Sequence, residues 1–99
     1  MLNLKDKVSI ITGASSGIGR GTAILFSNLG SKLVITGRDE YALNETISQC
    51  CPQSQKNVIK VVGDITNAEI CQKIVEEAIK NFGKIDILIN NAGALKTGS

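Results

Sequence analysis

Four short runs rich in β-branched residues alternate with stretches of helical periodicity, and this alternation constrains the fold more than any other feature of the sequence. The runs are VSIIT at 8–12, KLVIT at 32–36, NVIKVV at 57–62 and IDILI at 85–89. Near-continuous apolar strands are typical of a parallel sheet covered on both faces. Strands joined through helices require right-handed crossovers. The sequence therefore predicts an α/β fold, a partial Rossmann-type doubly wound parallel sheet of the form βαβαβαβ with strand order 3-2-1-4.

The stretches between the runs carry apolar residues at helical spacing, which predicts the helix faces that pack on the sheet. These residues are Ile18, Thr22, Leu25 and Leu29 in the first stretch, Leu43, Ile47 and Cys50 in the second, and Ile70, Ile74, Ala78 and Phe82 in the third, widened by Val75 and Ile79. Gly30, Pro52 and Gly83 follow the three stretches, as helix-ending residues do. TNAE at 66–69 has capping-box spacing, so we expect Thr66 to cap the third helix.

Length, charge and cysteine content narrow the class of protein. The 99 residues predict a single domain over 1–99. A net charge of +2 is too small and too dispersed to favour a nucleic-acid or membrane partner. The sequence has neither a run of about 20 apolar residues nor a signal-like start, so we expect a cytoplasmic protein. Three cysteines without a CxxC pair, and no histidine, predict reduced thiols and no metal site.

A glycine-rich segment, TGASSGIG at 12–19, directly follows the first predicted strand and opens the first predicted helix. Glycine permits positive φ and lets a phosphate approach the backbone closely. The amides of such a turn and of the helix start point at an anion, and Ser15 and Ser16 add hydroxyl donors. Arg20 follows Gly19 where a Walker A loop needs lysine, which excludes that class. The segment predicts nucleotide binding, with a purely structural tight turn as the alternative.

The end of the second predicted strand bears on which dinucleotide would bind. A carboxylate there would hold the ribose 2′-OH of NAD, but the sequence reads TGRD and places Gly37 at that point. Arg38 can pair instead with the 2′-phosphate of NADP. Alternatively, Arg38 is solvated or pairs with Asp39 or Glu40, and Asp39 is close enough to argue for NAD. We predict NADP as the cofactor, with NAD the less favoured alternative.

Polar residues also follow the third and fourth predicted strands. In GDIT, Asp64 can accept from an adenine amino group while the amide of Ile65 donates to the ring, or Asp64 can instead share a helix cap with Thr66. In NNAG, two asparagines can satisfy backbone groups where strands splay. The small Ala92 and Gly93 leave room there for a cofactor ribose.

These four motifs, TGASSGIG, GR, GDIT and NNAG, each after its own strand, closely resemble the N-terminal half of the short-chain dehydrogenase/reductase family from Leu4 to Gly93. The resemblance implies that Arg38 favours NADP, that Asp64 and Ile65 hold adenine, and that residues 91–93 line a ribose. Many NADP-preferring members carry a basic residue at the position of Ser16, so the preference depends on Arg38. The resemblance also implies that the pyrophosphate and adenosine ribose are wrapped by Gly13, Ser15, Ser16, Gly17, Ile18 and Gly19, and that the residues lining the cofactor's ribose are Asn91, Ala92 and Gly93.

The catalytic part of the family pattern has no counterpart here. Members use a serine, an asparagine and a Tyr-x-x-x-Lys pair that lie beyond NNAG, with tyrosine as the acid/base. The only tyrosine is Tyr41, and Glu45 stands where that motif requires lysine. We therefore predict no catalytic residue in this chain. We expect a truncated domain without a complete substrate region, which alone does not turn over substrate.

Two kinds of function remain from the sequence. The first is the NADP-binding portion of an oxidoreductase that interconverts alcohols and carbonyls by hydride transfer. The second is a non-catalytic module that binds a dinucleotide or pairs with a longer homologue. A flavin or mononucleotide binder is disfavoured by the four-motif match. Since the fourth strand would form an apolar sheet edge, we also expect an isolated chain that is marginally stable or self-associates.

Overall fold

The computed structural model describes residues 3–91, and its strands form one parallel sheet in the order β3-β2-β1-β4, which confirms the predicted topology. The 3₁₀ segment η1 was not predicted. Along the chain the elements are β1 Val8–Thr12, α1 Gly17–Asn28, β2 Lys32–Gly37, α2 Glu40–Ser48, η1 Pro52–Asn57, β3 Val58–Val62, α3 Ala68–Phe82 and β4 Ile87–Asn90.

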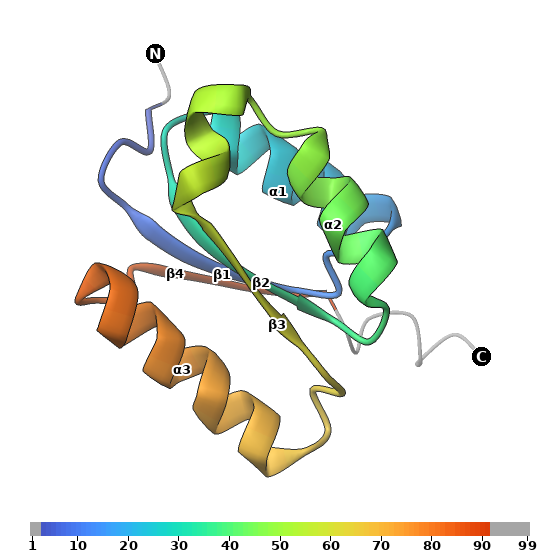
Figure 1. Ribbon diagram of the computed structural model, residues 1–99. Coiled ribbons are helices and arrows are strands. Elements are labelled where there is room, and N and C mark those ends of the chain that lie inside the picture. The colour runs from blue at the N-terminus through green and yellow to red at the C-terminus, as the bar shows by residue number, and fades with distance from the viewer. Residues whose placement is uncertain (1–2, 92–99) are drawn as a thin grey trace.

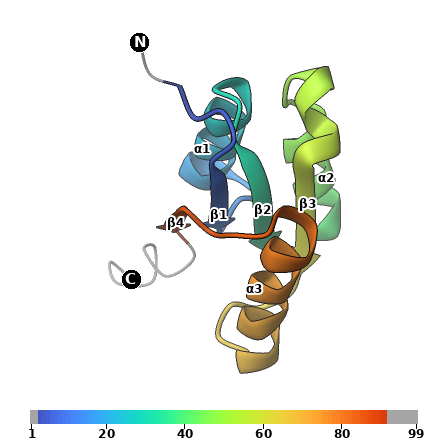
Figure 2. The same cartoon turned by 90° about the vertical axis from the view of Figure 1, so that its left-hand side faces the viewer.

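The sheet has helices on both faces, with α1 and α2 on one side and α3 on the other (Figures 1 and 2). Residues of β1 alternate between the two layers. Val8 and Ile10 join the cluster under α3, whereas Ile11 joins the cluster under α1 and α2. All five residues of β1 are buried. This two-sided burial explains why its sequence is almost continuously apolar.

The face that α1 turns to the sheet differs from the predicted stripe. The buried residues are Gly19, Ala23 and Ser27, while Ile18 is 76% exposed and Leu25 is 53% exposed. Small side chains let the helix backbone come close to the strand and loop beneath it. The hydrophobic stripe predicted for this helix is therefore wrong, because close approach selected small residues and apolar periodicity does not detect that requirement.

The other two helices agree better with prediction. Leu43 and Cys50 are buried beneath α2, and Ile74 and Ala78 are buried beneath α3, as expected. Ile70 and Phe82 pack against that cluster. The prediction that Val75 and Ile79 widen the buried face of α3 is wrong. These residues are 47% and 49% exposed, because within residues 3–91 no helix lies beside α3 to cover them.

The start of α3 is also capped differently from expectation. Asn67, and not Thr66, is the N-cap, since its side-chain oxygen accepts from the Glu69 N–H at 2.8 Å. Thr66 instead donates its N–H and hydroxyl to Asp64 Oδ1 at 2.9 and 2.8 Å. The capping box is therefore replaced by an Asp64 turn followed by an asparagine cap.

Residues that end the helices lie where the sequence placed them. Gly83 is the C-cap of α3 and has a left-handed φ of 83°, and Gly30 follows α1 with φ 96°. Pro52 begins η1 after α2. Left-handed backbone is accessible to glycine at no steric cost, which explains why the ends of α1 and α3 could be predicted.

β4 lies at one edge of the sheet and pairs with β1 alone, from Ser9↔Ile87 to Thr12↔Asn90. At its amino end the Val8 N–H donates to Asp86 Oδ2 at 2.9 Å, and Lys84 forms an ion pair with the same oxygen at 3.1 Å. These two hydrogen bonds, that of Val8 first, hold the pKa of Asp86 below the ordinary carboxyl value. The carboxylate therefore fixes where β4 begins beside β1.

Candidate functional site

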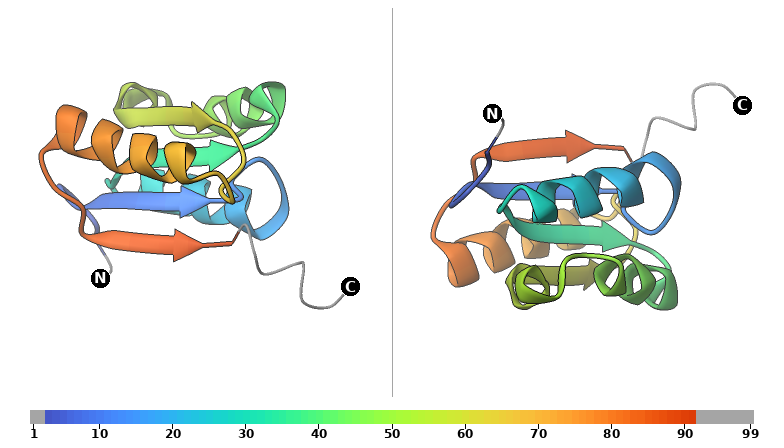
Figure 3. Two further views of the ribbon diagram at one scale, coloured as in Figure 1. Left: turned by 90° about the horizontal axis from the view of Figure 1, so that it is seen from below. Right: turned by 90° about the horizontal axis from the view of Figure 1, so that it is seen from above.

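The carboxyl ends of the strands lie at one edge of the sheet, where α1 and α2 begin (Figure 3). The glycine-rich loop after β1 and the Arg38 turn after β2 meet at this edge. Ala14 N–H donates to Thr36 O at 3.0 Å, which ties the loop to the end of β2. The Gly63 N–H donates to Gly37 O at 2.9 Å, which brings the end of β3 alongside. Three of the four predicted motif segments are thereby collected in one place.

The glycines of the loop have distinct structural requirements. Gly13 and Gly17 have φ values of 63° and 58°, in the left-handed region that other residues rarely adopt. Gly19 has an ordinary φ, but a Cβ there would lie 1.9 Å from Gly13 O and 2.6 Å from Gly13 C. The first turn of α1 therefore packs directly on the backbone of its own loop, and only glycine fits at position 19.

The two serines of the loop occupy different environments. Ser15 lies against Gly37, where an added Cβ would be 3.1 Å from Ser15 Oγ. Ser16 is the N-cap of α1 but makes no side-chain cap hydrogen bond. The first backbone bond into the helix runs from Arg20 N–H to Ser16 O at 3.2 Å. The N–H groups of the first turn precede that bond and have no acceptor within the helix, as at any helix start.

Arg38 lies at the rim of the site, and its side chain is 73% exposed. Its Nη1 is 4.0 Å from Asp64 Oδ2, at the limit of an ion pair. The alternative partners predicted for it are engaged elsewhere: Asp39 caps α2 by accepting from the Ala42 N–H at 3.2 Å, and Glu40 pairs with Lys60 at 2.9 Å. The Arg38 guanidinium, which directly follows the end of β2, thus forms a long ion pair with the Asp64 carboxylate.

Asp64 makes the local contact with Thr66 that the sequence offered as one of its two roles, and it also approaches Arg38. Its Oδ1 holds the turn before α3 through Thr66, and its Oδ2 faces Arg38. Ile65, next in the chain, is half-buried, and its carbonyl accepts a hydrogen bond from Cys71 Sγ at 3.0 Å. Both residues lie at the carboxyl end of β3, as predicted.

The end of β4 is joined to β1 by a threonine that the sequence reasoning did not single out. Thr12 Oγ1 donates to Asn90 Oδ1 at 2.7 Å and accepts from the Asn91 N–H at 3.0 Å. Among the described residues, Asn91 Nδ2 is a buried donor without a hydrogen-bond partner. Ala92 and Gly93, which the sequence also predicted in the site, lie outside the described residues.

Arg20 is a second residue that the sequence reasoning used only to exclude a Walker A loop. Its guanidinium turns back from α1 and bonds the loop at Ser15 and helix α2 at Ala42 and Thr46. A helix position occupied by arginine gives no signal of a partner 26 residues further on. The one sequence feature that could have indicated this contact is the cationic residue directly after the last glycine of the loop.

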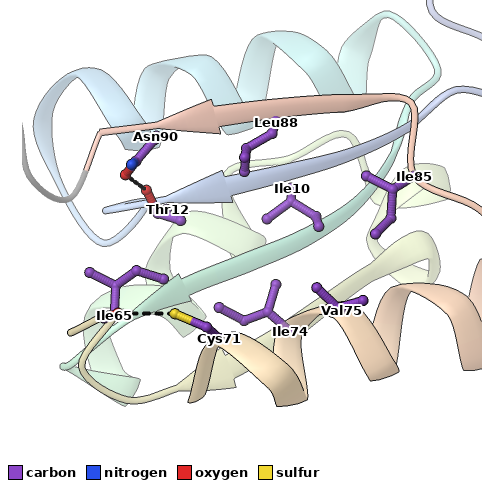
Figure 4. Close-up of a pocket in the computed structure, with 9 residues that line it drawn as sticks. All are labelled: Ile10, Thr12, Ile65, Cys71, Ile74, Val75, Ile85, Leu88 and Asn90. Atoms are coloured by element: carbon purple, nitrogen blue, oxygen red, sulfur yellow. Dashed lines mark hydrogen bonds between the residues drawn. The ribbon is translucent and has the colours of Figure 1, made fainter. Parts of the chain in front are cut away.

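An apolar groove of about 320 Å³ lies between α3 and the β1–β4 half of the sheet. Figure 4 shows Ile10 and Leu88 on the strands facing Ile74 and Val75 on the helix, with Thr12 and Asn90 at the carboxyl end. Within the described part of the chain, no charged side chain lines it. The groove is therefore suited to apolar contact and contains few groups that could orient a polar ligand.

Other kinds of site have no support in residues 3–91. No cluster of three or more histidine, cysteine, aspartate or glutamate residues suited to a metal ion occurs in this range. No helix between these positions has the length and apolar character that crossing a bilayer requires. Tyr41, the only tyrosine, is 89% exposed near the start of α2.

Comparison with known proteins relates this arrangement to one family. The family model described as short chain dehydrogenase matches residues 7–99. An uncharacterised oxidoreductase of Staphylococcus saprophyticus is 43% identical over 95 residues, which cover 96% of this chain and 41% of the relative. This chain thus spans about two fifths of that relative's length.

Solved structures agree in fold as well as in sequence. The apo form of glucose dehydrogenase from Caenorhabditis elegans superimposes with a TM-score of 0.85 at 43% identity, over 91% of this chain and 39% of that one. L-sorbose reductase from Gluconobacter frateurii, complexed with NADPH and L-sorbose, gives 0.83 at 35% identity, covering 92% and 35%. A 3-ketoacyl-(acyl-carrier-protein) reductase from Brucella melitensis, complexed with NADH, gives 0.77 at 36% identity, covering 87% and 34%.

Proposed function

This chain belongs to the short-chain dehydrogenase family and comprises its NAD(P)-binding Rossmann region, and on that premise we propose that it binds NADP at the carboxyl edge of the sheet. The observation that carries the proposal is the exposed Arg38 guanidinium beside a strand end that holds glycine in place of an acid. When bound, the cofactor supplies hydride transfer between an alcohol and a carbonyl.

The glycine-rich loop would hold the pyrophosphate. Gly19 brings the first turn of α1 against the loop, so the amides of that turn and of the loop open on the same edge. Ser16 leaves its hydroxyl outside the helix cap and can donate to a phosphate. Ile18 is exposed at the same helix start and can cover the cofactor. The residues proposed for this part are Gly13, Ser15, Ser16, Gly17, Ile18 and Gly19.

The remaining contacts would come from the other strand ends. Asp64 and the Ile65 amide can recognise adenine next to Arg38. The buried Asn91 Nδ2 is a donor that a cofactor hydroxyl could satisfy, which supports a ribose at the end of β4. Ala92 and Gly93 complete the proposed set from the sequence alone. The residues present thus fit a dinucleotide at each of its polar parts.

Arg38 carries the proposed preference for NADP over NAD. A bidentate guanidinium–phosphate contact is worth about 1.5–3 kcal/mol, or roughly a 10- to 150-fold difference in affinity. Within residues 3–91 the guanidinium has the 4.0 Å contact with Asp64 to exchange for it. Asp39, the residue that argued for NAD, already caps α2.

Titration of the chain with NADPH, NADH and FMN, followed by calorimetry, tests the proposal. We expect NADPH to bind at least tenfold more tightly than NADH, and FMN not to bind. Arg38→Ala should bring the two dinucleotides to similar affinity by weakening NADPH only. The matched control is Lys73→Ala, which removes an exposed cation on α3 across the sheet. Binding of neither dinucleotide, or an NADPH preference that survives Arg38→Ala, would refute the proposal.

We further propose that this chain alone does not carry out the hydride transfer. Tyr41 is solvent-exposed, and Glu45 occupies the position where a lysine would lower the tyrosine pKa. Purified chain with NADPH and a panel of aldehydes and ketones should show no oxidation of NADPH above the rate without protein. Steady turnover that Arg38→Ala abolishes would contradict this expectation.

Self-association through the β4 side of the sheet is the partner interaction we propose. Leu88 on the edge strand is 62% exposed and lines the apolar groove together with Val75 of α3, and Ile79 of the same helix is 49% exposed. Exposed apolar edges of this kind pair with a second strand or a second copy. Sedimentation should show larger species as concentration rises. Leu88→Lys should suppress them, whereas Tyr41→Lys on the other face should not, and a concentration-independent monomer would exclude the idea.

A further inference from the structure

Arg20 links the glycine-rich loop to helix α2 through three side-chain hydrogen bonds. Nη2 donates to Ser15 O at 2.7 Å and to Ala42 O at 2.9 Å, and Nε donates to Thr46 Oγ1 at 2.9 Å. The three acceptors lie in the loop and at two turns of α2. A planar guanidinium with donors in fixed directions can satisfy all three, which a lysine ammonium on one flexible stem cannot.

Thr46 extends this link to the neighbouring peptide group. Its side chain is fully buried, and Oγ1 lies 2.7 Å from Ala14 O and 3.1 Å from Ala42 O. Since the hydroxyl has one hydrogen and Arg20 Nε donates to it, the hydrogen is directed at the nearer carbonyl, that of Ala14. Arg20 and Thr46 together therefore hold two consecutive carbonyls of the loop, those of Ala14 and Ser15.

Fixing two carbonyls also fixes two amides. In a planar trans peptide the C=O and the following N–H point in opposite directions. The carbonyls of Ala14 and Ser15 point toward α2, so the N–H groups of Ser15 and Ser16 point away from it. Hydrogen bonds to these carbonyls thus determine the direction of two loop donors without contacting any ligand themselves.

We propose that Arg20 is a positioning residue that sets the loop amides of Ser15 and Ser16 for binding the dinucleotide phosphates. This inference rests on the proposed function, because those amides matter for binding only if the loop holds a pyrophosphate. The pyrophosphate is common to both dinucleotides, and the 2′-phosphate beside Arg38 is not. Loss of Arg20 should therefore weaken NADPH and NADH equally, whereas loss of Arg38 changes their ratio.

The decisive variants are Arg20→Met, which keeps an unbranched apolar stem, and Arg20→Lys, which keeps the charge. We expect Arg20→Met to weaken both dinucleotides by about tenfold or more, with an unchanged NADPH to NADH ratio, and Arg20→Lys to lie between it and the unmodified chain. Lys73→Met, on the exposed side of α3, is the matched control and should bind as the unmodified chain does. Titrations are made at a temperature where circular dichroism shows each variant folded.

Amide hydrogen exchange without any cofactor provides a second readout. In Arg20→Met we expect faster exchange at Ala14, whose N–H in the same loop donates to Thr36 O at 3.0 Å, with unchanged protection in β1 and β2. A purely stabilising role would instead raise exchange throughout the sheet and leave affinity intact in the folded protein. Should Arg20→Met not fold, Arg20→Lys and Thr46→Val replace it in both measurements.

The outcomes separate this inference from the proposed function. If the unmodified chain binds dinucleotide and the Arg20 variants bind equally well, positioning by Arg20 is refuted and the proposed function stands. If the unmodified chain binds neither dinucleotide, the proposed function fails, and with it the binding role of Arg20. Unchanged exchange at Ala14 in the Arg20 variants refutes positioning whether or not the cofactor binds.

Discussion

Replacing Gly19 by alanine tests whether the close packing of α1 on its own loop shapes the proposed cofactor site. The added Cβ would lie 1.9 Å from Gly13 O, and contacts under 3.0 Å are essentially never made by real Cβ atoms. Loop and helix must therefore separate by about 1.1 Å, the difference between these two distances. The obstructing atom is backbone, so no side-chain rotation can relieve the clash.

Gly21 offers a matched control in the same helix, because a Cβ there meets nothing within 4 Å. Glycine to alanine in a helix interior raises stability by about 1 kcal/mol through propensity alone, and this contribution is common to both variants. Overpacking costs about 1–3 kcal/mol. We therefore expect the free energy of unfolding of Gly19→Ala to lie about 1–3 kcal/mol below that of Gly21→Ala, which should itself be as stable as the unmodified chain or more so.

Urea unfolding followed by circular dichroism measures this difference, and calorimetric titration with NADPH measures its effect on the site. Because the separation displaces Gly13 and the following amides, Gly19→Ala should lose at least tenfold in NADPH affinity, while Gly21→Ala retains it. Equal stability and equal affinity of the two alanine variants would refute the reasoning that close approach requires glycine at position 19.

Two further predictions concern the attachment of β4 to β1. The pKa of Asp86 is lowered in the folded chain, so the unfolded chain binds more protons, and the stabilisation present above about pH 4 should disappear as the pH falls below that value. Asp86→Asn should flatten the unfolding free energy measured against pH in this range, and an unchanged slope would count against the assignment. Thr12→Val removes the hydroxyl that accepts from the half-buried Asn91 N–H and should cost about 1–3 kcal/mol in urea unfolding. Thr22→Val removes a hydroxyl that donates to Ile18 O within α1 and should change stability by about 0.5 kcal/mol or less. Equal losses in the two threonine variants would contradict the role of Thr12 in joining β4 to β1.

β1 and β2 followed from the sequence because these two central strands are buried on both faces, whereas β3 and β4 are only partly buried. A two-sided apolar environment leaves a run such as VSIIT with little choice but a sheet interior. The ends of α1 and α3 were equally predictable, because Gly30 and Gly83 adopt the positive φ that ends these helices. In both cases the chemistry of single residues decides the local structure.

Helix faces and caps were less predictable because neighbours decide them. The sheet side of α1 is formed by Gly19, Ala23 and Ser27, which apolar periodicity ranks below Ile18 and Leu25. At α3, Thr66 and Asn67 were both competent caps, and the hydrogen bonds to Asp64 engaged the former. Residues within a few positions of one another competed for the same role, and the sequence alone does not rank them.

In the candidate site, the sequence placed residues at the correct strand ends but missed the contacts between segments. Arg38 and Asp64 were predicted separately, yet their 4.0 Å approach depends on the pairing of β2 with β3. The bond from Arg20 to Thr46 spans 26 residues and joins two helices. Such contacts become visible only once the sheet has placed distant segments side by side.

The pairing of β1 with both β2 and β4 has a consequence for the order of folding. β1 is synthesised first among the strands, but the hydrogen bonds that fasten β4 to it join residues 78 positions apart. During synthesis β2 becomes available to β1 early, whereas β4 becomes available only after α1, α2 and α3 have been made. Contacts this distant in sequence form slowly, because loop closure precedes any gain from them. The β1 flank therefore stays open until β4 has emerged, and during this interval it is exposed to misassembly.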